Sequence, residues 1–172
     1  MVYNRRMETS PAFQDHYPEE LSHCYGCGRN NPQGNQLKSR WDASGEVTVA
    51  SFTPKPHHTV VSGYVYGGLI ASLIDCHGAG SAAAAAHRAE GREMGREPLL
   101  PFVTASLQVD FLVPTPQGEE LTLRGEIAEL GARKVIVDVT LSAAGQIRAR
   151  GRVIAVKMPA AMGNAGTQAD RG

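Results

Sequence analysis

Apolar and polar residues alternate over four segments in the second half of the chain. Every second residue is apolar from 103 to 113, and the pattern recurs over 121–127, 135–141 and 146–158. A period of two predicts a strand with one buried face. Prolines follow the first segment, and glycines separate the later ones. We therefore expect four strands joined by short turns in an antiparallel meander.

A period of 3.6 residues marks the segment from Gly67 to about Arg88. Its apolar stripe consists of Leu69, Ile70, Leu73 and Ile74. Five consecutive alanines extend the pattern over 82–86, and alanine has the highest helix propensity. The sequence predicts one long helix that ends near Gly91.

The segments 37–41 and 46–52 predict a hairpin around Ser44 and Gly45. The order is then two strands, one long helix and four strands. A single helix buries its apolar stripe when a sheet wraps around it, so the predicted class is α+β.

Both ends of the chain lack a period. We expect an extended, mobile N-terminal arm over 1–20, one domain over 21–158 and a disordered tail over 159–172.

The helix face opposite the apolar stripe is unusual because its residues are small, apart from Asp75. They are Gly68, Ala71, Gly78, Ala79, Ala82 and Ala86. Such a stripe allows another backbone to approach closely, which suggests the same helix of a second subunit. A carboxylate buried there can act as a general base, because burial raises its pKa. The alternative is an ordinary surface carboxylate on an exposed face.

Gly67 and Gly68 stand at the predicted start of this helix. Free backbone N–H groups at a helix N-terminus stabilise negative charge, as an oxyanion hole does. The alternative is a tight turn into the helix.

The stretch from Tyr66 to Asp75 resembles the His-Gly-Gly-(x)6-Asp signature of hotdog-fold acyl-CoA thioesterases of the PaaI (phenylacetyl-CoA thioesterase) type. The stretch Cys24–Gly28, followed by Asn31–Gly34, is similar to a segment that precedes the hotdog domain in many members. Tyr66 stands where the family has histidine, and a phenol is not a proton carrier at neutral pH.

The resemblance implies a homodimer, or a dimer of dimers, with its sites at the subunit interface. Asp75 would be the base or the nucleophile, the Gly67 amide would bind the thioester oxygen, and Thr104 of the other subunit would orient water. The expected substrate-binding residues are Tyr66, Gly68, His58, Arg133 and Lys134.

The expected function is hydrolysis of an acyl-CoA thioester. One alternative is an acyl-CoA binding or sensing module without turnover, which the missing histidine favours. The other is a hotdog hydratase or dehydratase, which would normally use a histidine together with an acid.

Composition narrows these expectations. Lys and Arg number 17, as do Asp and Glu, which argues against a nucleic-acid binder. No apolar run approaches the roughly 20 residues of a membrane span, and no signal peptide is expected. The odd count of three cysteines indicates free thiols and a cytoplasmic location.

Cys24 and Cys27 have a metal-ligand spacing, but a structural zinc site needs four ligands. Cys76 and His77, on the predicted helix, would have to complete the set. We therefore expect no metal and no cofactor.

Overall fold

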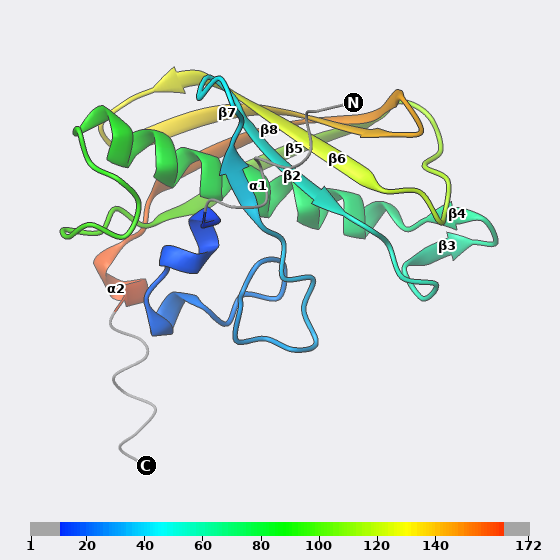
Figure 1. Cartoon of the computed structure of the whole chain (residues 1–172), viewed down its shortest axis with the longest axis horizontal. Helices are drawn as coiled ribbons and strands as arrows, with labels where there is room; N and C mark the ends of the chain where they lie inside the picture. The colour runs from blue at the N-terminus through cyan, green and yellow to red at the C-terminus, as the bar shows by residue number, and fades with distance from the viewer. Residues whose placement is uncertain (1–10, 164–172) are drawn as a thin grey trace, which may run out of the picture.

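One long helix packs against a curved, six-stranded antiparallel sheet in the computed structural model, which describes residues 11–163 (Figure 1). The helix, α1, spans Gly67–Ala89. The strands, in spatial order, are β1 (Ser39–Trp41), β2 (Thr48–Phe52), β6 (Leu121–Leu130), β7 (Lys134–Ala143), β8 (Gln146–Lys157) and β5 (Phe102–Phe111). This is the predicted hotdog arrangement, with the helix bounds and the β1–β2 hairpin where the sequence places them.

A second, two-stranded sheet stands just before α1. It consists of β3 (Thr59–Val61) and β4 (Tyr64–Val65), too short for a period of two to reveal them. Backbone hydrogen bonds attach this hairpin to the β5–β6 connection, since the Val65 N–H donates to the Thr115 carbonyl at 2.9 Å. The hairpin therefore fixes where α1 begins.

The predicted four-strand meander is wrong at β5. The strands β6, β7 and β8 form a meander, but β5 pairs with β8 and lies at the far edge of the sheet, while β6 pairs with β2. The proline-containing connection after β5 lets the chain cross from one edge to the middle of the sheet. The outer edge of β5 has no strand beside it within the described residues.

The predicted single buried face of β5 is also wrong, because a β-bulge interrupts it. Thr104 pairs with Ala155 and Ser106 pairs with Ile154, so Ala105 is the extra residue. Before the bulge Thr104 lies opposite the buried Ala155 and Val103 points to the other face, whereas beyond it Leu107 and Phe111 lie opposite the buried Val153 and Ala149. Both remain partly exposed, at 37% and 56%, because β5 is an edge strand. An extra residue reverses which face each later side chain occupies.

The core lies between α1 and the sheet, and glycines set how close the two come. A side chain at Gly78 of α1 would overlap Val153 of β8. A side chain at Gly151 of β8 would overlap Ile74 of α1 in the same way. Only hydrogen at these positions allows the observed approach.

This contact corrects part of the predicted helix face. Gly78, Ala82 and Ala86 are buried by the same chain rather than available to a partner. The half-exposed positions are in the first half of α1, at Ala71, Asp75 and Ala79.

The length and mean hydropathy (1.3) of α1 would also suit a membrane span, contrary to the sequence-based expectation. However, 78% of its apolar window is buried inside the domain, as in the core helix of a globular fold.

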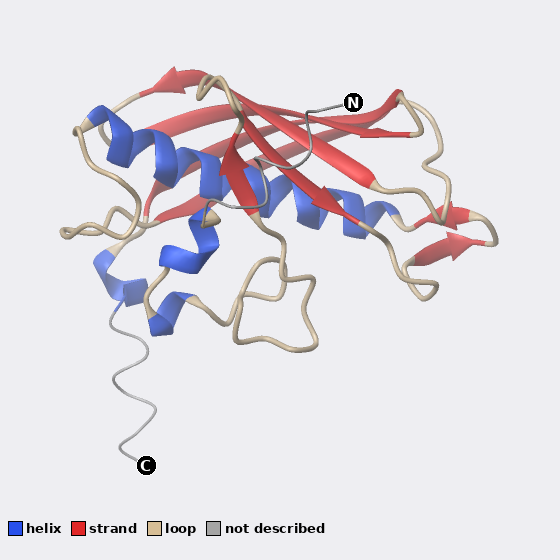
Figure 2. Ribbon diagram, in the orientation of Figure 1, coloured by secondary structure: helices blue, strands red, loops and turns tan. Residues whose placement is uncertain are grey.

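The N-terminal segment packs on the side of α1 away from the sheet (Figure 2). Its two 3₁₀ helices are η1 (Phe13–His16) and η2 (Glu19–Leu21), and Phe13 is 4% exposed. The expectation of an extended arm is therefore wrong for residues 11–20, while residues 1–10 lie outside the described residues. Within the expected tail, α2 spans Ala160–Gly163, and residues 164–172 are also outside.

A buried polar network joins this segment to the core. His77 is fully buried, with Nδ1 at 2.9 Å from Ser39 Oγ and Nε2 at 3.2 Å from Thr48 Oγ1. Gln14 accepts from the Ser39 N–H at 2.8 Å, and Thr48 Oγ1 lies 2.6 Å from Ser81 Oγ. Burial lowers the pKa of His77 to about 4, so the ring is neutral and one ring nitrogen accepts. Its burial follows from the helical period, because His77 comes four positions after Leu73 and three after Ile74 of the apolar stripe.

We expect His77→Leu to lower the free energy of unfolding by about 1–3 kcal/mol, because it removes hydrogen-bond partners from buried hydroxyls. Urea denaturation measures the change. His23→Leu is the matched control, since its side chain is 61% exposed. Equal stabilities of the two variants would contradict the structural role of the network.

Candidate active site

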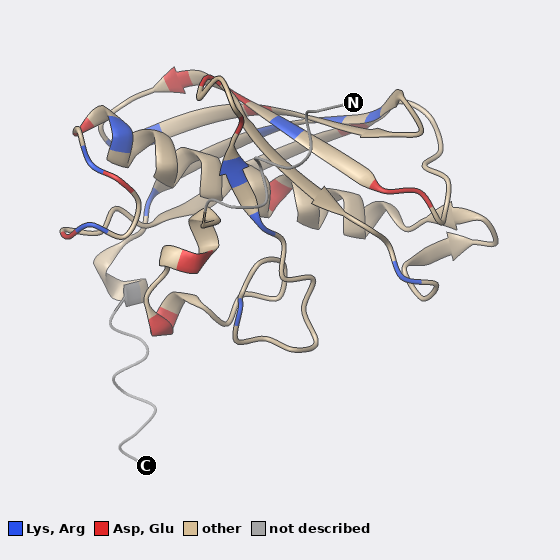
Figure 3. Ribbon diagram, in the orientation of Figure 1, with Lys and Arg blue, Asp and Glu red and all other residues tan. Residues whose placement is uncertain are grey.

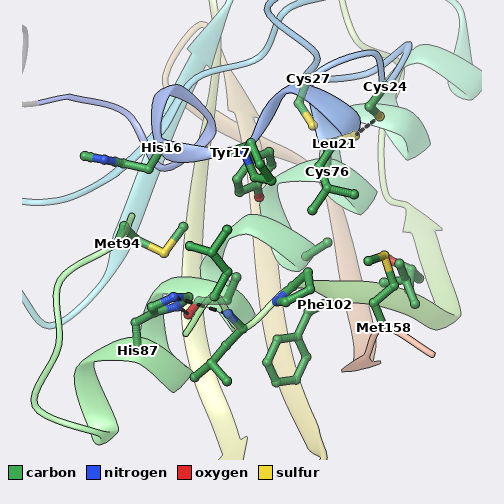
Figure 4. Close-up of a pocket in the computed structure, with 18 of the residues that line it drawn as sticks. His16, Tyr17, Leu21, Cys24, Cys27, Cys76, His87, Met94, Phe102 and Met158 are labelled. Carbon is green, nitrogen blue, oxygen red and sulfur yellow. Dashed lines mark hydrogen bonds between the residues drawn. The ribbon is translucent and has the colours of Figure 1, made fainter. Parts of the chain in front are cut away.

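A cavity of about 350 Å³ lies between the N-terminal segment, α1 and the start of β5 (Figure 4). Most of its lining is apolar, and its principal apolar residues are Leu21, Ala79, Ala83, Met94, Leu99, Leu100, Phe102, Val103 and Met158. Small-molecule sites span about 300–1,000 Å³, so this volume suits a small apolar group.

Asp75 and Thr104, two of the three predicted catalytic residues, line this cavity. Both belong to the one chain described, and the threonine of a second subunit that the resemblance implies stays a prediction. Thr104 reaches the wall because it precedes the bulge of β5.

The carboxylate of Asp75 is the unusual polar group of this wall. Its Oδ1 atom is buried and has no hydrogen-bond partner among the described residues. A buried carboxylate oxygen without a donor is costly, because its hydration is not replaced. The arrangement leaves this oxygen available to a water molecule, a ligand or a second subunit.

The third predicted catalytic residue, Gly67, is at the N-terminus of α1 and does not line the cavity. Neither its N–H nor that of Gly68 has an acceptor among the described residues. The Tyr66 ring folds back over Gly68, where any side chain would overlap it, and is 55% exposed. These amides are thus open to an anionic oxygen beside an aromatic ring.

His58 belongs to this end of the helix rather than to the cavity. Its carbonyl accepts from the Tyr66 N–H at 3.0 Å, and its Nδ1 accepts from the Lys55 N–H at 3.0 Å. Partial burial, the neighbouring His57 and Lys55 lower its pKa. One ring nitrogen is therefore already occupied, and no contact with Asp75 is present.

Arg133 lies in the β6–β7 turn and Lys134 begins β7, and neither lines the cavity. Lys134 Nζ lies 3.0 Å from a Glu129 carboxylate oxygen. The Arg133 carbonyl accepts from the Lys157 N–H at 3.0 Å, next to Met158 of the cavity wall.

Figure 3 shows charges of both signs spread over strands and loops, in keeping with a net charge of zero.

Three cysteines from two separate segments meet at one wall of the cavity. The sulfur atoms of Cys24, Cys27 and Cys76 all lie within 4.8 Å of one another. Hydrogen bonds from the other two thiols and from the backbone N–H groups of Cys27 and Gly26 hold the pKa of Cys24 well below its usual value. His77, the other candidate zinc ligand, is committed to the core network instead.

The periods and motifs of the sequence do not predict most of the cavity wall. The missing residues come from the N-terminal segment and from the loop before β5, and they include Tyr17, Leu21, His87, Met94, Leu99 and Leu100. The spacing of Phe13, Tyr17 and Leu21 at every fourth residue is the one available signal of a buried face there.

Comparison with known proteins agrees with the fold. A family model described as the thioesterase superfamily matches residues 62–149. The chain belongs to the thioesterase superfamily. A search of curated proteins gave no match.

Solved structures of thioesterase superfamily folds include a member from Shewanella loihica that is 50% identical. The match covers 83% of this chain and 100% of that chain, with a TM-score of 0.62. PaaI of Escherichia coli, from the phenylacetic acid degradation operon, is 18% identical over 66% and 74% of the two chains, with a TM-score of 0.55. The smu.793 protein of Streptococcus mutans, solved bound to acetyl CoA, is 17% identical over 66% and 82%, with a TM-score of 0.54. The similarity to PaaI and to smu.793 shows that the chain shares their fold.

We expect Asp75→Ala to leave the free energy of unfolding unchanged or to raise it, because the unpartnered carboxylate oxygen contributes no hydrogen bond to the fold. Thermal or urea denaturation measures this. Asp42→Ala is the control, since Asp42 Oδ1 accepts from Ser44 Oγ and the Gly45 N–H, and its loss costs about 1 kcal/mol. A larger loss at Asp75 than at Asp42 would mean that the Asp75 carboxylate is structural.

Proposed function

We propose that this protein hydrolyses an acyl-CoA thioester, with Asp75 as the base or the nucleophile. The observation that carries the proposal is the buried, unpartnered Oδ1 of Asp75 on the wall of an apolar cavity. A catalytic side chain that must contact substrate often has no hydrogen-bond partner within the protein, and this lowers the stability of the fold. Membership of the thioesterase superfamily supports the reaction class.

The cavity is suited to the acyl group rather than to coenzyme A. Its apolar lining matches an alkyl or aryl chain, and about 350 Å³ is too small for the nucleotide as well. The nucleotide would then extend along the surface. The acetyl CoA bound to the Streptococcus mutans protein supports a CoA ester as the ligand class.

A complete site requires two subunits for a geometric reason. Gly67 and Asp75 are eight positions apart on one helix, and a rise of 1.5 Å per residue separates them by about 12 Å. One thioester carbonyl cannot contact both groups of the same chain. In a dimer with antiparallel helices, Gly67 of one subunit comes to lie near Asp75 of its partner, and each dimer holds two equivalent sites.

The surface around β5 supports such a dimer. The outer edge of β5 is unpaired within the described residues, and exposed edges invite pairing with another chain. Large apolar side chains are exposed on and beside it, with Phe111 at 56%, Leu112 at 47% and Tyr66 at 55%. Ala71 of α1, which is half-exposed and does not line the cavity, leaves room for a second helix.

In this mechanism the Gly67 amide of one subunit hydrogen-bonds the carbonyl oxygen as it becomes an oxyanion. In one route Asp75 of the partner accepts a proton from the water that attacks the carbonyl; the C–S bond then breaks, and the leaving CoA thiolate takes up that proton. In the other route the Asp75 carboxylate attacks the carbonyl and the C–S bond breaks as an anhydride forms; water then hydrolyses the anhydride to the free acid, restores Asp75 and supplies the proton for the CoA thiolate. The Thr104 hydroxyl, on the same cavity as Asp75, positions the attacking water. The Tyr66 ring lies against Gly68, beside the open amides, and makes no proton transfer.

Asp75→Asn should lower kcat by about 10²–10⁴, because the amide neither accepts the proton nor attacks. The assay follows loss of thioester absorbance with aryl, short-chain and medium-chain acyl-CoAs, since the protein's own thiols do not disturb that signal. Asp138→Asn, which removes a surface partner of Arg152, should keep the wild-type rate. Binding of CoA esters without turnover by the wild type would favour the binding module instead.

Leu107→Glu should convert the dimer to a monomer and abolish turnover, because it places a charge on the helix side of the unpaired β5 edge and separates Gly67 from the partner's Asp75. Light scattering coupled to size-exclusion chromatography measures the mass. Leu130→Glu is the control, since Leu130 is 48% exposed on β6, away from this edge. A monomer that retains full activity would overturn the shared site.

A further inference from the structure

The three cysteines of the chain form a cluster that hydrolysis does not use. Cys24 and Cys27 lie in the N-terminal loop and Cys76 lies on α1, yet their sulfur atoms are within 4.8 Å of one another. Figure 4 shows the Cys24 and Cys76 side chains directed at each other across the gap between loop and helix. Their sulfurs are 3.8 Å apart.

These separations match those of thiolates around one metal ion. A Zn–S bond is about 2.3 Å long, which sets a sulfur–sulfur distance of about 3.8 Å in a tetrahedral site. The Cys24–Cys76 distance has this value. Zinc sites often take two ligands spaced as Cys-x-x-Cys, and three protein ligands with a water molecule in the fourth position also make a tetrahedral set.

The loop backbone is shaped around the cluster. A side chain at Gly26 would overlap Cys76 Sγ, so glycine is what allows the loop to approach the helix. The Gly28 N–H donates to the Cys24 carbonyl at 2.8 Å, which closes the turn. The Asn35 N–H donates to the Tyr25 carbonyl at 2.8 Å, and the Leu37 N–H to the Gly26 carbonyl at 3.1 Å. The cysteines are thus held in place by hydrogen bonds that do not involve their side chains.

We infer that Cys24, Cys27 and Cys76 bind one zinc ion, which joins the N-terminal loop to α1. All three residues line the cavity, so a water molecule from it can supply the fourth ligand. His77 is excluded as that ligand, because both of its ring nitrogens are engaged with Ser39 and Thr48.

The ion would stand beside Asp75, the residue that precedes Cys76 on the helix. Its role is to fix the N-terminal wall of the cavity, since Tyr17 and Leu21 of that wall are connected to α1 through the same loop. The site depends only on the cysteine cluster, so it stands or falls independently of thioester hydrolysis.

The test is metal stoichiometry of the full-length protein. The protein is reduced, incubated with zinc, passed through a desalting column and analysed by plasma mass spectrometry, with about one zinc ion per chain expected. Cobalt in place of zinc should give thiolate-to-metal charge-transfer bands and the intense d–d bands of a tetrahedral site. A wild-type protein that retains no zinc overturns the proposal.

Cys24→Ser and Cys76→Ser should each reduce the bound zinc at least tenfold. Cys24 is exposed, so its variant keeps the fold if burial of Cys76 makes the second variant unstable, and circular dichroism verifies this. His23→Ala is the matched control, because His23 neighbours Cys24 without belonging to the cluster, and it should retain the metal. Zinc retained by the folded Cys24→Ser variant, or a wild-type mass lower by two hydrogens from a disulfide after zinc treatment, overturns the site.

Discussion

The close approach of α1 to the sheet is the constraint on which the remaining structure depends. Gly78 on the helix and Gly151 on β8 each leave space for a branched side chain of the other element, Val153 and Ile74. The helix therefore lies deep in the curve of the sheet, and its opposite side can be covered by a short N-terminal segment. Because that segment and the helix face each other at side-chain distance, the cavity and the cysteine cluster form between them. The His77 network joins the helix to β1 and β2, and Gln14 connects the segment to it.

The sequence was sufficient for the elements whose periods are long and uninterrupted. The bounds of α1 and the β1–β2 hairpin follow from apolar spacing and turn residues. The position of β5 in the sheet could not be predicted in this way. A period of two shows that a strand has one apolar and one polar face, but it does not show which strand is its neighbour. The bulge at Ala105 also leaves no mark in the sequence, since the apolar alternation continues through it.

Some residues of the candidate site could likewise be predicted from the sequence, and others could not. Asp75 was predictable because a single carboxylate interrupts a face of small residues, and Gly67 because paired glycines open the helix. Tyr17, Leu21 and Leu100 were not, since they belong to irregular segments whose position depends on tertiary contacts. Cys76 illustrates the limit most sharply: its distance from Cys24 is 52 residues along the chain and 3.8 Å in space.

The bulge in β5 has a consequence for how the protein can vary. Phe102 and Thr104, before Ala105, line the cavity, whereas Leu107 and Phe111 beyond it lie opposite Val153 and Ala149, on the helix side of the unpaired sheet edge. One strand thus carries two independent sets of positions, separated by a single unpaired residue. Substitutions that change the preferred acyl group and substitutions that change the assembly can accumulate separately on the same ten residues, so relatives can diverge in one property while the other is conserved.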